Sequence, residues 1–124
     1  MKSSSALLSL GWSLALASTA SATPVPGDRL AGAAIFQDRC AICHVPQGGG
    51  QGPSLTLVID RAAGSVKGFN YTAALKASGL TWTATTLDVF LSNPGKAVPG
   101  TAMPIRVSDF RQRADLIAYL TEHK

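Results

Sequence analysis

The chain has 124 residues, a formal charge of +4 and two cysteines, with many glycines and prolines but few aromatic residues. The positive charge is scattered rather than gathered in runs, which gives no basis for binding nucleic acid or a membrane surface. One domain of this size lies near the lower limit for a self-sufficient hydrophobic core. Such domains usually need a disulfide, a metal or a cofactor for stability.

Residues 1–22 have the pattern of a secretory signal peptide that is cleaved. Lys2 gives a positive start, residues 6–17 are largely apolar, and three small residues precede the expected cleavage point before Thr23. The alternative is a membrane anchor, but a bilayer span needs about 20 apolar residues, and polar residues interrupt this shorter stretch. We therefore expect residues 23–124 to form one exported domain with no further membrane span, located in the periplasm.

Both cysteines and one of the two histidines lie within CAICH, residues 40–44. Export into an oxidising compartment permits a disulfide, and Cys-X-X-Cys is also a redox motif, although that motif needs alternating strands and helices around it. A zinc site normally takes four Cys or His ligands, and residues 23–124 offer only Cys40, Cys43, His44 and His123.

The spacing C-x-x-C-H instead favours covalent attachment of haem. Cys40 and Cys43 are three positions apart on one helical turn, so both thiols can add to the vinyl groups on one edge of a porphyrin. The next residue, His44, then places an imidazole nitrogen at the iron. Export fits as well, because c-type haem is assembled outside the bacterial cytoplasm.

Met103 is the expected ligand on the other side of the iron. It is the only methionine after the signal peptide, and it lies in NPGKAVPGTAMP, residues 93–104, which is too rich in proline and glycine to be a helix or strand. A lone methionine in such a loop is not a typical core gap-filler. His123 is the competitor, but we expect it in a frayed and solvated terminal turn.

A histidine–methionine pair predicts an electron carrier rather than an enzyme. The soft, neutral thioether of Met103 favours Fe(II) and raises the reduction potential. With His44 and Met103 on both faces, the iron has no free position for oxygen or peroxide, so one-electron transfer remains.

The chain from Gly32 to Leu120 resembles the class I c-type cytochromes, especially the branch of mitochondrial cytochrome c and its soluble bacterial relatives. The matching segments follow in the family order: GAAIFQDRCAICHVP, GPSL, GFNYTAALKASGLTW, TLDVFLSNP, PGTAMP and RADLIAYL. The resemblance implies an all-α class I cytochrome c fold, with about three main helices, short helices and Ω loops around one covalently bound haem c.

In this family the first and last helices cross near the haem, with a glycine at the contact. The resemblance therefore implies that Gly32 lies against Tyr119 and Phe36 against Leu116. We also expect Ser108 to cap the last helix, because serine is a favoured N-cap residue.

The resemblance implies three groups of supporting residues. Pro53, in GPSL, would accept the ring N–H of His44 and so orient the ligand. Haem propionates are costly to bury without donors, and the residues at the matching donor positions are Arg61, Tyr71 and Trp82. The residues at positions that tie down the methionine loop by hydrogen bonds are Asn93 and Thr101.

Departures from the mitochondrial pattern bear on the partner. Gly95 and Ala102 replace lysines beside the haem edge, Lys96 keeps one, and Phe90 replaces a tyrosine near the methionine sulfur. We therefore expect a monomer with a more neutral, apolar docking face. Its redox partners would be a membrane cytochrome complex, an oxidase or a periplasmic dehydrogenase of a respiratory chain.

Two alternatives stay open at the sequence level. The chain could be the dedicated cytochrome subunit of a specific periplasmic oxidoreductase. It could also bind or convert a ligand at the iron, although gas-binding four-helix cytochromes carry their motif near the C-terminus and di-haem peroxidases need two motifs.

Overall fold

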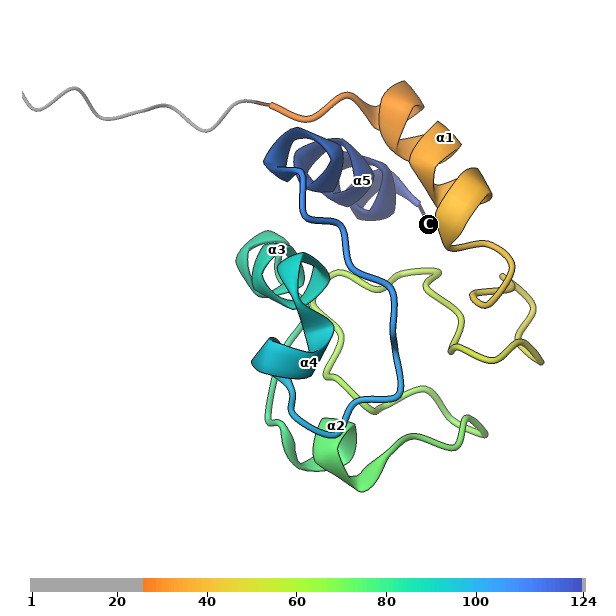
Figure 1. The fold of residues 1–124 in the computed structure, drawn as a ribbon. Helices are drawn as coiled ribbons and strands as arrows, with labels where there is room; N and C mark the ends of the chain where they lie inside the picture. The colour runs from red at the N-terminus through yellow and green to blue at the C-terminus, as the bar shows by residue number, and fades with distance from the viewer. Residues whose placement is uncertain (1–25, 124) are drawn as a thin grey trace, which may run out of the picture.

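The computed structural model describes residues 26–123, and the expected signal peptide, residues 1–22, lies outside them. In chain order these residues form the helices α1 (Arg29–Arg39), α2 (Ala73–Ala77), α3 (Ala84–Ser92), α4 (Pro94–Ala97) and α5 (Phe110–Glu122) (Figure 1). Within the described chain the only β pairing is an isolated bridge between Ala62 and Thr81. The predicted all-α fold, with three longer helices and further short ones, is confirmed.

Each helix begins after a polar side chain that accepts a backbone N–H, as short oxygen-bearing residues do at N-caps. The five caps are Asp28, Thr72, Thr83, Asn93 and Asp109. The expectation that Ser108 caps the last helix is wrong by one residue. The carboxylate of Asp109 accepts the N–H of Gln112 at 2.9 Å, and its negative charge also suits the positive end of the helix.

Helices α1 and α5 cross in close contact because small residues let their backbones approach. A Cβ at Gly32 would overlap the backbone carbonyl of Asp115 and lie 2.9 Å from Cβ of Tyr119. The rings of Phe36 and Tyr119 pack with centroids 5.2 Å apart. The predicted contact between Gly32 and Tyr119 is thus confirmed, and Phe36 and Leu116 share one buried core.

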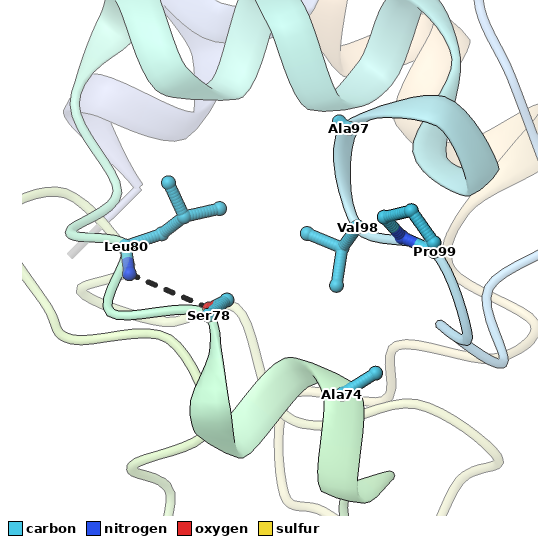
Figure 2. A pocket seen from close by; sticks show the side chains of 6 residues that line it. All are labelled: Ala74, Ser78, Leu80, Ala97, Val98 and Pro99. Atoms are coloured by element: carbon cyan, nitrogen blue, oxygen red, sulfur yellow. Dashed lines mark hydrogen bonds between the residues drawn. The ribbon is translucent and has the colours of Figure 1, made fainter.

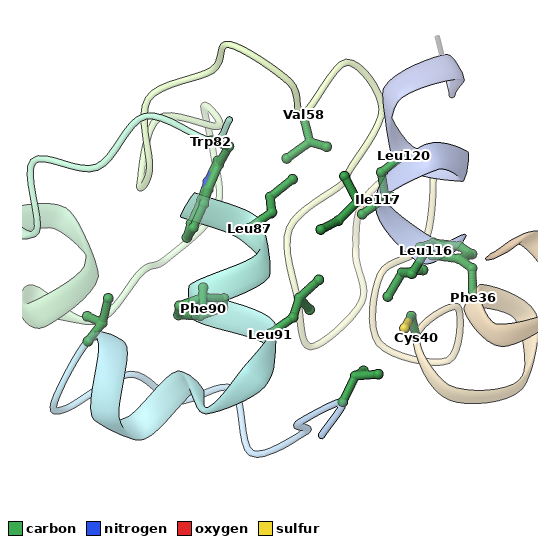
Figure 3. Close-up of a cluster of buried hydrophobic side chains, with 12 residues drawn as sticks. Phe36, Cys40, Val58, Trp82, Leu87, Phe90, Leu91, Leu116, Ile117 and Leu120 are labelled. Carbon is green, nitrogen blue, oxygen red and sulfur yellow. The ribbon is translucent and has the colours of Figure 1, made fainter. Parts of the chain in front are cut away.

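The core extends from this crossing to α3. Figure 3 shows Phe36, Cys40 and Leu116 at the α1–α5 end, and Trp82, Leu87 and Phe90 at the α3 end. The long stretch between α1 and α2 has no helix (Figure 1) and contributes Val58, which is 1% exposed, to the core. Among residues 26–123, no helix has both the length and the apolarity that crossing a bilayer requires.

Candidate functional site

A cavity of about 380 Å³ lies among α3, the loop after CAICH and the segment around Met103. Its walls include the apolar side chains of Leu55, Val58, Leu87 and Leu91. A volume above 300 Å³ with mostly apolar walls is typical of cofactor sites. The fold brings eight of the sequence-predicted site residues to this one cavity: Cys43, His44, Pro53, Arg61, Tyr71, Trp82, Thr101 and Met103.

The imidazole of His44 is fixed in one tautomer. Its Nδ1 lies 2.8 Å from the carbonyl oxygen of Pro53, and since a carbonyl only accepts, Nδ1 carries the proton. Burial lowers the pKa of His44, with the Pro53 hydrogen bond acting more weakly in the opposite direction. The ring is therefore held neutral, and Nε2 keeps a lone pair for a metal. The contact between His44 and Pro53 is the one that the sequence resemblance implied.

The lack of a side chain at Gly52 makes room for the imidazole of His44. Sequence reasoning did not single out this glycine. A Cβ on Gly52 would lie 2.5 Å from Cε1 and 2.7 Å from Nδ1 of that ring. These separations are well inside the van der Waals contact of about 3.5 Å. The only sequence signal was that a glycine precedes the proline that orients the histidine.

The two cysteines differ in their surroundings. Cys40 ends α1 and is 9% exposed, whereas Cys43 is half-buried and lines the cavity. Burial raises the pKa of the Cys40 thiol, partly opposed by the nearby Arg39 charge. Both thiols are free, so the structure does not contain the disulfide that was one alternative. The backbone N–H groups of Cys43 and His44 both bond to the carbonyl of Cys40, at 3.1 and 2.9 Å, which keeps the motif in one tight turn.

No zinc site forms around these thiols in the part of the chain that the structure describes. Nowhere in that part do three or more His, Cys, Asp or Glu side chains gather as metal ligands would. His123, expected in a frayed and solvated turn, instead stacks on Tyr119 with centroids 5.1 Å apart, and its carbonyl accepts the N–H of Leu57 at 3.2 Å. His123 does not line the cavity. Met103, which does, is therefore the candidate for the second ligand beside His44.

The methionine segment is braced on its upstream side by Thr101. The hydroxyl of Thr101 accepts the N–H of Met103 at 3.4 Å, and the N–H of Thr101 bonds to the carbonyl of Val98 at 3.0 Å. Asn93 acts one step further away. Its side chain caps α4 through the N–H of Lys96 at 3.2 Å rather than touching Met103, and this short helix shows that the expectation of no helix in residues 93–104 is wrong.

Three polar side chains reach the cavity from the surrounding loops and turns. Arg61 donates to the carbonyls of Thr56 at 2.9 Å and Ser54 at 2.8 Å, and burial lowers its pKa. The hydroxyl of Tyr71 accepts the N–H of Val66 at 3.2 Å, which leaves its own proton free to donate. Trp82 is 8% exposed and packs on Phe90 with centroids 5.0 Å apart. Each of the three therefore combines an N–H or O–H group with a fixed position on the cavity wall.

A second hollow of about 210 Å³ lies between α2 and α4 (Figure 2). Its six lining residues are Ala74, Ser78, Leu80, Ala97, Val98 and Pro99, and its one polar side chain, Ser78, accepts the N–H of Leu80 at 3.4 Å. The hollow thus has neither a charged side chain nor a metal-ligating one, and the chemistry of this domain belongs to the larger cavity.

The donors at the larger cavity fit an iron porphyrin. Two thiols at the C-x-x-C spacing precede a neutral imidazole, a thioether lies in the facing segment, and apolar walls lie between them. Such a set suits covalent attachment to vinyl groups and axial ligation by nitrogen and sulfur. The candidate site is therefore a pocket for one covalently held haem.

Comparison with known proteins agrees with this chemistry. The family model described as "Cytochrome c" matches residues 30–124. The chain is 45% identical over 101 residues to a cytochrome c of Cannabis sativa, covering 78% of this chain and 91% of that protein. It is also 45% identical over 104 residues to a cytochrome c2 of Rhodomicrobium vannielii, covering 78% and 81%. A solved structure, cytochrome cH from Methylobacterium extorquens, matches with a TM-score of 0.73 at 41% identity, covering 77% of this chain and 98% of that one.

Proposed function

This chain belongs to the cytochrome c family and carries one covalent haem c for electron transfer rather than catalysis, and on that premise we propose that it is an exported carrier of single electrons. In this proposal Cys40 and Cys43 hold the haem through thioether bonds, and His44 and Met103 ligate the iron. The bound haem supplies a metal that gains or loses one electron without forming or breaking a bond.

The observation that carries the proposal is the hydrogen bond from Nδ1 of His44 to the carbonyl of Pro53 at 2.8 Å. It fixes the ring orientation and leaves Nε2 as the ligand atom, and such a second partner strengthens a histidine as a ligand. Since Gly52 leaves no slack around the ring, His44 stays in place when the charge of the metal changes. Little structural rearrangement then accompanies each electron transfer.

Met103 gives the site its selectivity for electron transfer. If His44 and Met103 both ligate the iron, as proposed, the metal would have no free position for a substrate. The neutral sulfur also stabilises the reduced state and so raises the reduction potential. The brace from Thr101 to Met103 supports the loop that presents this sulfur.

We further propose that Arg61, Tyr71 and Trp82 serve the haem propionates. All three line the cavity, and each has a donor group there, which buried carboxylates need. Arg61 also ties down the carbonyls of Ser54 and Thr56, directly after Pro53. It therefore acts on both the propionate side and the loop that orients His44.

The proposed location is the periplasm, because residues 1–22 read as a cleaved signal peptide. The proposed partners are a membrane cytochrome complex, an oxidase or a periplasmic dehydrogenase, each of which binds the chain as a monomer.

Two exposed isoleucines lie close in sequence to the proposed haem-binding residues. Ile42, between the two cysteines, is 84% exposed, and Ile105, two residues after Met103, is 38% exposed. These side chains support docking through an apolar face. Electron-transfer rates that change little with ionic strength are expected, and a steep dependence would contradict this face.

Optical spectra of the purified haem-loaded protein test the proposal. The oxidised form should show the far-red sulfur-to-iron band, and the reduced form should not change when carbon monoxide is added. The Met103→Ala variant should lose this band and bind carbon monoxide. The substitution leaves the attachment motif, residues 40–44, intact. A wild-type reduced spectrum that shifts with carbon monoxide would mean an open sixth position and would rule out the simple carrier.

A further inference from the structure

Three successive carbonyl groups just after Met103 each accept hydrogen bonds from an arginine. The chain from Pro104 to Asp109 has no helix and runs up to α5 (blue in Figure 1). Arg39, at the end of α1, donates to the carbonyl of Arg106 at 2.9 Å. Arg113, in α5, donates to the next two carbonyls, those of residues 107 and 108, at 3.0 and 2.8 Å. We call Arg39 and Arg113 the arginine clamp.

The clamp is anchored on helices outside the segment that it binds, since Arg39 ends α1 and Arg113 lies in α5. The side chain of Arg113 is only 12% exposed and forms an ion pair with Asp88 of α3 at 2.7 Å. The middle residue of the bound segment, Val107, is 1% exposed. Its N–H donates to the carbonyl of Leu91 in α3 at 2.8 Å. Arg39 immediately precedes Cys40. The segment after Met103 is thus tied both to the core helices and to the turn that bears the attachment motif.

The two sides of Met103 are held very differently. Upstream, its own N–H reaches the hydroxyl of Thr101 at 3.4 Å, which is a long and weak hydrogen bond. Downstream, the three bonds come from guanidinium groups, and bonds with a charged partner are about twice as strong as neutral ones. A movement of the backbone that withdraws the sulfur of Met103 from the site and extends to residues 106–108 would break bonds at the clamp.

We propose that the arginine clamp sets the rate at which Met103 leaves the iron. This inference rests on the proposed function, in which Met103 is the axial ligand. Arg39 and Arg113 are positioning residues that touch neither the sulfur nor the metal. They act by raising the free energy of the local opening that exposes the sixth coordination position.

The test measures the entry of cyanide into the oxidised, haem-loaded protein at saturating cyanide, where opening of the loop limits the rate. Arg113→Gln and Arg39→Gln should each raise this rate, by at least about tenfold for Arg113, which loses two charge-assisted hydrogen bonds to the segment. Asp88→Asn keeps the carbonyl bonds of Arg113 and removes only its ion pair, so it should give a smaller increase. Arg29→Gln is the matched control, because Arg29 pairs with Glu122 at 2.8 Å on the surface, away from the segment.

Hydrogen exchange separates this role from a general loss of stability. In Arg113→Gln, the exchange rate of the Val107 N–H should increase over its wild-type value. This increase should be larger than the increase at the N–H of Leu116 in α5. A uniform increase at both positions, with an unchanged cyanide rate, would show that Arg113 only stabilises the fold and would overturn the inference. Arg39→Gln, at a more exposed position, gives the same comparison if Arg113→Gln does not fold.

The outcomes for the two proposals can be told apart. A wild-type protein without the far-red sulfur-to-iron band would overturn the assignment of Met103 and with it the clamp. A wild-type protein that shows the band, with wild-type cyanide rates in both arginine variants, would overturn the clamp alone.

Discussion

Replacing Gly52 by alanine tests the packing around His44 most directly. Gly52 does not have a positive φ angle, so alanine suits its backbone, and the added methyl group is the only perturbation. That methyl carbon would lie 2.5 Å from Cε1 of His44, where carbon atoms pack at about 3.5 Å. The ring must therefore move by about 1 Å, which takes Nδ1 out of bonding range of the Pro53 carbonyl, now at 2.8 Å.

The expected loss of stability follows from these displacements. Losing the hydrogen bond costs about 1 kcal/mol, and overpacking costs about 1–3 kcal/mol. Lower entropy of the unfolded chain returns about 0.4–1 kcal/mol on replacing glycine by alanine. The free energy of unfolding of the haem-loaded protein should thus fall by about 1–3.6 kcal/mol. Guanidinium titrations followed by far-UV dichroism measure it.

Gly95→Ala is the matched control. Gly95 lies in α4 without a positive φ, and its Cβ would meet only the Asn93 side-chain oxygen at 3.9 Å, an ordinary contact. This variant should be as stable as wild type or slightly more so, because alanine favours helix. If Gly52→Ala also unfolds within about 0.5 kcal/mol of wild type, which is the usual range for surface substitutions, the argument that Gly52 gives His44 its place is refuted.

Three further substitutions test other contacts. Gly32→Ala should lower the free energy of unfolding by about 2 kcal/mol, because overlap with the carbonyl of Asp115 outweighs the helix preference of alanine; a melting temperature equal to wild type would contradict the close crossing of α1 and α5. Asp115→Ala should cost about 1–2 kcal/mol, since the carboxylate accepts the N–H of Asp28 at 2.7 Å, and Asp115→Asn should recover part of this in the same thermal scans. Trp82→Phe should keep the packing on Phe90 and lower the reduction potential, because a propionate without its donor stabilises the oxidised metal. A potentiometric titration measures this potential, and a value equal to that of wild type would remove Trp82 from the donor set.

Local sequence patterns predicted the fold class and the covalent haem correctly. The spacing within CAICH acts inside one helical turn, and the surrounding pattern and the expected export then favoured haem over a disulfide, a redox pair or zinc. The contact between Gly32 and Tyr119 was also foreseen, because residues on one helix face must meet a partner and the family resemblance named it. The N-cap of α5 was missed by one residue, since Ser108 and Asp109 are both good caps and only the course of the preceding segment selects between them.

Contacts between distant segments were much harder to predict. His123 was expected in solvent, yet its ring stacks on Tyr119, four residues earlier, and its carbonyl accepts the N–H of Leu57 from a distant loop. Nothing in the sequence marked Arg39 and Arg113 as different from other surface arginines. Their partners are backbone carbonyls, which every residue has, so no residue type at a fixed spacing could reveal the pairing.

The sequence by itself thus indicated the chemistry of this protein: two thiols and an imidazole at one spacing, one methionine in a segment rich in proline and glycine, and helices with apolar faces. These features depend on residues that are neighbours along the chain, where spacing and side-chain type are enough. The tertiary structure decided how firmly that chemistry is held, through Gly52 against His44 and two arginines on the segment after Met103. These contacts join segments that meet only when the hydrophobic core forms, and their strength depends on distances that the order of residues does not contain.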